Sequence, residues 1–250
     1  MRKGLFFMIL AVFTACENPD GVYYFYDIVN KELECCDEDA CASVYMTYPR
    51  FKPVNPTFRQ MNQRVSGELY SYLQIGDVEE QAEENEMFEF FCEAFKEAAS
   101  GKVESPQNWE LDTRANITQM GTETISLRIN HHQFTGGAHP NSVVSYMIFD
   151  LSEPGKVLDP LELILDRDAL LEKVEAAFRE HHKVEDGISL SEDGRFFLDK
   201  DSIFLPSAMG YEGKDWVMVY NTYEVAPYSM GQTVLSFSLD ELKGIVKGWK

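Results

Sequence analysis

The spacing of hydrophobic residues predicts several helices along the chain. Apolar residues recur at steps of three and four over residues 58–73 and again over residues 88–99, which is the spacing of amphipathic helices. A third run of this kind begins at Asp168, and Asp159-Pro160 has the cap and the first-turn proline of a short helix reaching towards residue 165. Residues 238–241 form a capping box, which predicts a final helix.

Strands are predicted where apolar and polar residues alternate. Residues 125–130 alternate strictly, and residues 143–149 resume the pattern after a glycine-rich loop, so the two segments predict a β-hairpin. Further strand-like segments are residues 22–28, 43–48, 195–198, 203–205, 216–220 and 234–237. The mixture predicts an α+β fold, with a small N-terminal α/β unit packed on a larger C-terminal unit of antiparallel strands and helices.

The first sixteen residues have the pattern of an export signal. Two basic residues precede an apolar run over residues 5–13, and Thr14-Ala15 supplies the small residues before a cleavage site at Cys16. The run has about half the length needed to cross a hydrocarbon core of roughly 30 Å. Phe13-Thr14-Ala15-Cys16 resembles the lipobox of bacterial lipoproteins, although Leu is usual in place of Phe13. We therefore expect a signal peptide over residues 1–15 and acylation of Cys16, for example with palmitate.

This signal predicts a location in the cell envelope. Several acyl chains on one residue hold a protein firmly to a membrane. We expect an extracytoplasmic lipoprotein, anchored at the outer membrane or the cell surface. The alternative is an ordinary secreted protein in which Cys16 is incidental.

The remaining cysteines point to the same compartment. Beyond Cys16 the chain holds an even four, namely Cys35, Cys36, Cys41 and Cys92. In an exported protein this predicts two disulfides. The neighbours Cys35 and Cys36 are poorly placed to join each other, so we expect one to pair with Cys41 and the other with Cys92. A zinc site is the alternative, but the two-residue spacing typical of zinc ligands is missing.

The charge balance limits the possible partners. The sequence holds 42 acidic and 22 basic residues, for a formal net charge of -20. Such a surface repels nucleic acid and attracts cationic partners. With 44% hydrophobic and 13% aromatic residues the chain nevertheless has the composition of a folded protein. We divide it into the signal peptide, a lipidated acidic segment over residues 16–42, an N-terminal α+β unit over residues 43–112 and a C-terminal α+β unit over residues 113–250.

Two motifs carry a resemblance to a known family. Thr135-Gly136-Gly137-Ala138-His139 lies on the predicted hairpin, and Phe149-Asp150-Leu151 and Leu158-Asp159 follow it. Tyr223-Glu224-Val225-Ala226-Pro227-Tyr228, with Gly231, comes far downstream. In this order they resemble the paired domains found in the extracellular part of the RsiV anti-sigma factor, which senses lysozyme, and in the N-terminal region of PdaC-like peptidoglycan deacetylases.

The resemblance runs from about Tyr45 to Val246. It implies a PdaC-like N-terminal unit, an RsiV-like C-terminal unit, and lysozyme or peptidoglycan as partners. The chain departs from the family in two ways, because we find neither a transmembrane helix with a sigma-binding segment nor a following deacetylase domain.

Both motifs are expected to be structural or to contact a partner. Gly136 and Gly137 can take positive φ and let the hairpin turn sharply, while Pro140 favours an extended conformation at His139. We expect Tyr223 and Tyr228 to fill space between a strand and a turn, and Glu224 to accept hydrogen bonds from the glycine loop. Ala138, Pro227 and Gly231 complete the candidate residues.

Patterns typical of enzymes are weak. His131, His132 and His139 could form a zinc site only if all three converged, but adjacent residues on a strand point to opposite faces. No nucleophile elbow and no phosphate-binding glycine pattern occurs. We therefore predict no catalytic residue, no metal and no cofactor.

The sequence favours a non-catalytic binding domain. It would capture lysozyme, another cationic protein or a cell-wall glycan through its acidic surface and exposed aromatic residues such as Trp109 or Trp216. One alternative is an envelope polysaccharide hydrolase or deacetylase, or an accessory domain of one. Another is a structural scaffold lipoprotein.

Overall fold

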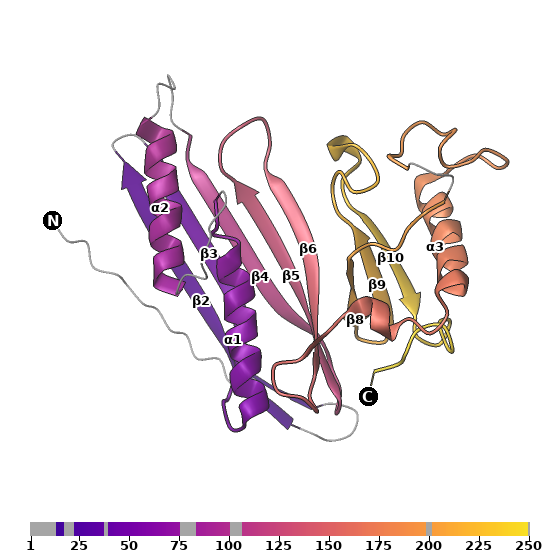
Figure 1. Ribbon diagram of the computed structural model, residues 1–250, viewed down its shortest axis with the longest axis horizontal. Helices are drawn as coiled ribbons and strands as arrows, with labels where there is room; N and C mark the ends of the chain where they lie inside the picture. Colours follow the sequence, from indigo (N-terminus) through magenta and orange to yellow (C-terminus); the bar gives the residue numbers. More distant parts are fainter. Residues whose placement is uncertain are drawn as a thin grey trace. The chain divides into compact units, whose positions relative to one another are not determined.

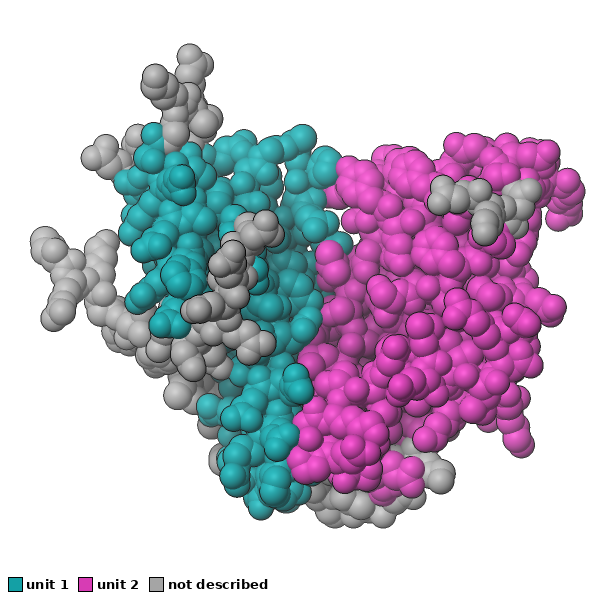
Figure 2. Space-filling view, viewed as in Figure 1, with its two compact units in different colours: residues 1–17, 21–116, 130–142 teal, residues 18–20, 117–129, 143–250 magenta. Residues whose placement is uncertain are grey.

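The computed structural model describes residues 14–17, 23–37, 40–75, 84–100, 107–198 and 202–249. The chain divides into two compact units, coloured separately in Figure 2 and described one at a time below. Unit 1 comprises Met1–Glu17, Gly21–Asn116 and Asn130–Ser142, and unit 2 comprises Asn18–Asp20, Ile117–Ile129 and Val143–Lys250. Most of the predicted signal peptide, residues 1–13, lies outside the described residues, as does the side chain of Cys16.

Unit 1 is built on long strands covered by two helices. The elements within it are β1 (Thr14–Glu17), β2 (Tyr23–Asp37), β3 (Ala40–Phe51), α1 (Pro56–Ser71) and α2 (Glu84–Ser100). Strands β2 and β3 pair antiparallel, and β3 runs parallel to β4 (Trp109–Met120). Figure 1 shows α1 and α2 on the same side of these strands. Every second residue from Ala40 to Met46 is buried, as expected for a strand with one face against helices.

The helices of unit 1 follow from their sequences. Asn55 caps α1 by accepting a hydrogen bond from the backbone N–H of Phe58, and Pro56 occupies the first turn, where its missing N–H costs nothing. Met61, Val65 and Leu69 recur at steps of four and are fully buried. The helix over residues 58–73 is thus confirmed, and α2 confirms the second helical pattern within the described residues.

Three strands contribute residues to both units. They are β4, β5 (Thr124–Phe134) and β6 (Asn141–Asp150), and the short β7 (Val157–Leu158) follows in unit 2. The order in the sheet is β1-β2-β3-β4-β5-β6-β7, so strands adjacent in sequence are also neighbours in space. Strands β5 and β6 confirm the two predicted arms of the glycine-loop hairpin.

Unit 2 adds a second sheet and a helix. Its further elements are η1 (Pro160–Leu163), α3 (Arg167–His182), β8 (Ala208–Glu212), β9 (Asp215–Tyr220), η2 (Tyr228–Met230) and β10 (Thr233–Ser238). The sheet order is β10-β9-β8, antiparallel throughout. Leu170, Val174 and Phe178 of α3 are fully buried in one core with Trp216 and Tyr220. Helix α3 lies beside this sheet (Figure 1), and the predicted α+β class is confirmed.

Three predictions of secondary structure are wrong. Residues 195–198 and 203–205 are irregular: Phe196, Ile203 and Leu205 are buried as strand residues would be, but these segments form no sheet ladder. The predicted final helix is a single turn. Its capping box forms as expected between Ser238 and Glu241, but Gly244 takes a φ of 82°, which ends the helical path at once.

Two disulfides link the cysteines of unit 1. Cys35 is joined to Cys92, which ties β2 to α2, and Cys36 is joined to Cys41 across the β2–β3 hairpin. This is one of the two pairings left open above. Among the residues that the structure describes, no helix has both the length and the apolar character needed to cross a membrane.

Candidate binding surface around Tyr223

An unusual turn follows strand β9 in unit 2. The backbone N–H of Glu224 donates to the carbonyl of Asn221 at 3.0 Å, which closes a turn over residues 221–224. Within it Tyr223 takes a φ of 67°, although its side chain is 53% exposed. A positive φ is rare for a bulky residue and persists only where the surroundings impose it. The turn therefore presents a tyrosine to solvent in a conformation that glycine would adopt more easily.

Asn221 fixes one end of this turn. Its Oδ1 accepts hydrogen bonds from the backbone N–H of Val144 at 2.8 Å and from Nε2 of Gln232 at 2.9 Å. Its Nδ2 donates to the carbonyl of Val144 at 3.0 Å. Val144 is buried, so these bonds satisfy backbone groups that would otherwise lack a partner away from water. The amide thus ties the turn to strand β6.

Glu224 holds the other end. One of its carboxylate oxygens accepts from the backbone N–H of Asn221 at 2.8 Å, and the carboxylate also accepts from the backbone of Ser207. Burial raises the pKa of Glu224 above its ordinary value, and these two hydrogen bonds oppose that rise. Both donors belong to unit 2, so Glu224 braces its own turn, whereas we had expected it to accept from the glycine loop.

Two further exposed aromatic residues are hydrogen-bonded through their backbones to the residues on either side of the turn, Val225 and Tyr220. Phe197 is 54% exposed, and its backbone N–H donates to the carbonyl of Val225 at 2.8 Å. Phe204 is 38% exposed, and its carbonyl accepts a hydrogen bond from the hydroxyl of Tyr220. We call Phe197, Phe204 and Tyr223 the aromatic surface. Hydrogen bonds hold the backbone of these segments, while the three rings are exposed to solvent.

The rest of the second motif closes the loop between β9 and β10. Pro227 precedes the single turn η2, and Gly231 ends it at a φ of 71°. The ring of Tyr228 lies 5.8 Å from that of Tyr223, at an interplanar angle of 35°. Tyr228 therefore supports Tyr223 from one side, whereas Tyr223 itself is largely exposed and does not fill the space predicted for it.

The glycine loop belongs to unit 1. Gly136 and Gly137 have φ values of 90° and 100°, and the backbone N–H of Gly137 donates to Oε1 of Gln107 at 2.9 Å. A Cβ atom on Gly136 would lie 3.1 Å from the same oxygen. The side chain of His139 is exposed, and its Nδ1 lies 3.4 Å from the carbonyl oxygen of Pro140. Gly136 and Gly137 thus shape the loop, and Ala138 and His139 lie exposed beside them.

The two tryptophans named as exposed binding residues are buried. Trp109 is 8% exposed and packs between Phe91 and Phe95 of helix α2, with ring centroids 5.7 and 5.6 Å away. Trp216 is fully buried against Tyr211 in the core of unit 2. That expectation is therefore wrong, because large aromatic side chains contribute most when they fill a core.

The three histidines considered for zinc do not come together. His131 is buried, stacks on Tyr72 and lies 2.8 Å from Oγ1 of Thr113 through its Nδ1. Burial lowers the pKa of His131, which favours the neutral ring. Nδ1 of His132 lies 3.0 Å from the hydroxyl of Ser142. In the described part of the chain, one group alone has three possible metal ligands within 4.8 Å of one another, namely Glu34, Cys36 and Cys41.

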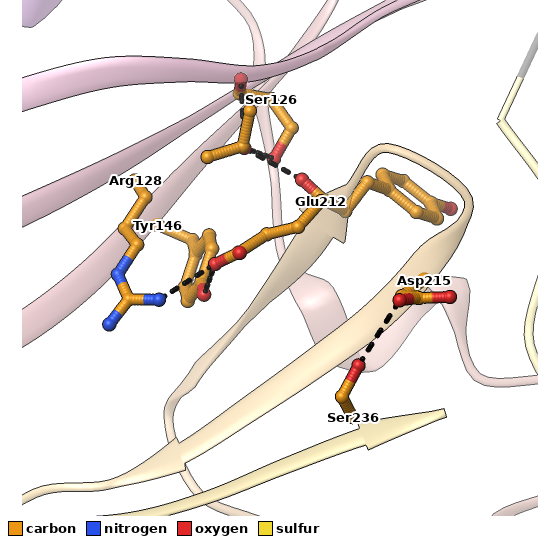
Figure 3. Close-up of polar contacts among 8 residues, drawn as sticks. Ser126, Arg128, Tyr146, Glu212, Asp215 and Ser236 are labelled. Carbon is orange, nitrogen blue, oxygen red and sulfur yellow. Dashed lines mark hydrogen bonds and ion pairs between the residues drawn. The ribbon is translucent and has the colours of Figure 1, made fainter. Parts of the chain in front are cut away.

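Unit 2 also contains a polar cluster that the sequence pattern did not predict. Oε1 of Glu212 accepts from Nη1 of Arg128 at 2.9 Å and also from the hydroxyl of Tyr146 (Figure 3). A Cβ on Gly210 would lie 2.2 Å from the ring of Tyr146, so only glycine fits beneath this ring. The cluster joins β5, β6 and β8, and its charges are paired. We therefore assign it a structural role.

Comparison with known proteins places the chain in a group of paired domains. Residues 35–142 match the family model described as deacetylase PdaC, and residues 163–240 match the model described as a protein of unknown function, DUF3298. The chain carries paired PdaC and DUF3298 domains. The resemblance inferred from the two motifs is thereby confirmed, and the two domain types together suggest an extracytoplasmic protein.

Solved structures share the fold of this PdaC–DUF3298 pair. A DUF3298 family member from Bacteroides fragilis is 16% identical with a TM-score of 0.62, covering 89% of this chain and 94% of its own. A DUF3298 family protein from Pseudomonas aeruginosa is 17% identical with a TM-score of 0.61, covering 92% of this chain and 96% of its own. No sequence among the curated proteins matches the chain.

Proposed function

We propose that this PdaC–DUF3298 protein is a non-catalytic binding module of the cell envelope, anchored by lipid at Cys16, which captures a cationic protein such as lysozyme. The observation that carries the proposal is the exposed ring of Tyr223 on a turn held at positive φ. A backbone conformation of this kind costs on the order of 1–3 kcal/mol and is typical of functional positions.

The chemistry of the aromatic surface suits a cationic protein. Arg and Lys side chains are attracted to the faces of aromatic rings. The formal net charge of -20 adds a long-range attraction for a positively charged partner, which raises the rate of encounter. Lysozyme is the specific candidate because the motifs resemble those of the lysozyme-sensing RsiV ectodomain.

The polar groups around the turn support binding in preference to catalysis. The side chains of Asn221 and Glu224 are engaged in hydrogen bonds to backbone groups that hold the turn. The groups of the aromatic surface that remain to meet a ligand are aromatic rings, which supply contact area, and the hydroxyl of Tyr223 is the one protic group among them. A hydrolase or deacetylase would need an acid, base or metal at the surface where the substrate lies.

The experiment compares two tyrosine variants. Immobilised hen lysozyme is titrated with the purified protein and with Tyr223→Ala and Tyr45→Ala, because Tyr45 is also exposed but lies on β3 of unit 1. We expect Tyr223→Ala to weaken binding at least tenfold and Tyr45→Ala to change it less than twofold. Equal binding by all three proteins would refute the role of the aromatic surface.

A cell-wall glycan is the second candidate ligand. The observation that favours it is the exposure of the ring of Tyr223 and of two aromatic rings on segments bonded to the residues beside its turn, since such rings stack on the faces of sugars. Peptidoglycan fragments should then bind with little dependence on salt, in contrast to a cationic protein. Binding of the fragments that is lost in Tyr223→Ala, with no binding of lysozyme, would select the glycan.

A further inference from the structure

The solvent face of the β2–β3 hairpin carries a second set of chemically active side chains. Glu34 and Cys36 are two residues apart on β2 and therefore point to the same face. Cys41 lies directly opposite Cys36 in the antiparallel ladder, with the two Cα atoms 4.1 Å apart. One carboxylate and two sulfur atoms thus gather at the end of a hairpin, in a part of unit 1 far along the chain from Tyr223.

The spacing of these atoms is suited to a metal ion. A carboxylate oxygen of Glu34 and the two sulfur atoms all lie within 4.8 Å of one another. Around a tetrahedral zinc ion with Zn–S bonds of about 2.3 Å, two thiolates are about 3.8 Å apart. The disulfide occupies both sulfurs in the oxidised protein. Reduction would release two thiols that must move apart to meet zinc.

The backbone that positions the three ligands does not depend on the Cys36–Cys41 bond. The β2–β3 ladder is continuous from Tyr26 to Asp37, and the separate Cys35–Cys92 disulfide ties the same part of β2 to helix α2. The backbone N–H of Cys41 donates to Oδ1 of Asn108 at 2.9 Å, which fixes β3 beside it. A site framed in this way is largely organised before the metal binds, which favours affinity.

The two disulfides differ in their access to a reductant. Cys36 is exposed, whereas Cys92 lies on helix α2 and is buried. Thiol–disulfide exchange needs an attacking thiolate to reach a sulfur atom, so exposed disulfides react first. Mild reduction should therefore open the Cys36–Cys41 bond while the Cys35–Cys92 bond continues to hold the fold.

The charge around the pair favours a cation. Glu32 precedes Glu34 on the same face of β2, and Glu110 of β4 is the register partner of Ser43, which itself lies opposite Glu34. Glu32, Glu34 and Glu110 are all exposed. Their carboxylates disfavour thiolates as long as no cation is present, and they attract a divalent ion that neutralises the thiolates.

We propose that Glu34, Cys36 and Cys41 form a zinc site that is closed by oxidation and opened by reduction. A dithiol donates two electrons and two protons to the disulfide, giving two cysteine thiols and the oxidised, cyclic dithiol. Zinc then binds both sulfurs and the carboxylate of Glu34 and displaces the two thiol protons. A water molecule would complete the tetrahedron, as in sites with three protein ligands. The site is independent of the proposed capture of a cationic protein.

The test uses the purified protein before and after brief reduction with a phosphine. Mass spectrometry of alkylated samples shows that the Cys36–Cys41 bond alone has been opened. Zinc is titrated with a chromogenic chelator as competitor, and cobalt is titrated separately for its thiolate charge-transfer band. We expect one zinc ion per reduced chain, the cobalt band of a two-thiolate site, and no binding after reoxidation.

Three variants separate the ligands from the general charge of the surface. Glu34→Gln should lower zinc affinity at least tenfold, and Cys36→Ser combined with Cys41→Ser should abolish binding. Glu32→Gln removes the same charge two residues away and should change affinity less than threefold. Absence of zinc binding by the reduced protein, or equal losses in Glu34→Gln and Glu32→Gln, would overturn the proposal.

Discussion

Replacing Tyr223 with glycine and with alanine tests whether the turn truly imposes a positive φ. Both changes remove the same ring and the same contact with Tyr228, so these losses cancel when the two variants are compared. The left-handed conformation costs a residue with a Cβ about 1–2 kcal/mol. Glycine escapes this cost but loses about 0.4–1 kcal/mol through the greater freedom of its unfolded chain. Tyr223→Gly should therefore be more stable than Tyr223→Ala by about 1 kcal/mol.

The free energy of unfolding is measured by urea denaturation of both variants. Tyr45 supplies the control, because it lies within strand β3, where glycine should be less stable than alanine by about 0.5–1 kcal/mol. The two positions should thus give opposite signs. An alanine variant at position 223 that is as stable as the glycine variant would show that residue 223 is not held at a positive φ.

Three further predictions concern a buried glycine, a histidine and a disulfide. Gly210→Ala should destabilise the protein by about 2–3 kcal/mol in urea denaturation, because its Cβ would overlap the ring of Tyr146. The double variant Gly210→Ala with Tyr146→Ala should lose less free energy of unfolding than the sum of the two single variants. Losses that simply add would refute the clash. Burial lowers the pKa of His182 to about 4, so the stability that the neutral ring contributes to the fold is complete above the unfolded pKa of about 6.5 and is lost as the pH falls from there towards 4. The melting temperature should therefore fall less steeply over this pH window in His182→Gln than in the unmodified protein. Equal slopes of melting temperature against pH in the two proteins would contradict this prediction. Cys35→Ser with Cys92→Ser should cost about 4 kcal/mol, since the bond joins residues 57 apart in sequence, and a loss below about 1 kcal/mol in calorimetry would argue against the pairing.

Helices α1, α2 and α3 and the hairpin could be predicted from the sequence because their apolar faces are regular. Strand β4 was missed because its buried face includes Thr113 and Ala115 where large apolar residues would be expected. Thr113 can be buried there because its hydroxyl bonds to His131, a partner eighteen residues away. Strand β8 was missed for a similar reason, since Gly210 interrupts its pattern to make room for Tyr146. Contacts between distant segments decide both cases.

The candidate surface was only partly visible in the sequence. The motif identified Tyr223 and Glu224 as notable, but a tyrosine gives no signal that it will take a positive φ. Asn221 was missed altogether, because its importance comes from its bonds to Val144 and Gln232. Aromatic content alone could not distinguish the buried tryptophans from the exposed Phe197, since exposure depends on how the core closes.

Calorimetric titration of the purified protein with lysozyme, at low salt and at near-physiological salt, tests the proposed capture of a cationic protein most directly. The proposal predicts submicromolar binding that survives the added salt, because shaped contacts at the aromatic surface would remain when long-range charge is screened. Binding that is absent, or that collapses as the salt is raised, would contradict it and leave the acidic surface as a nonspecific attraction.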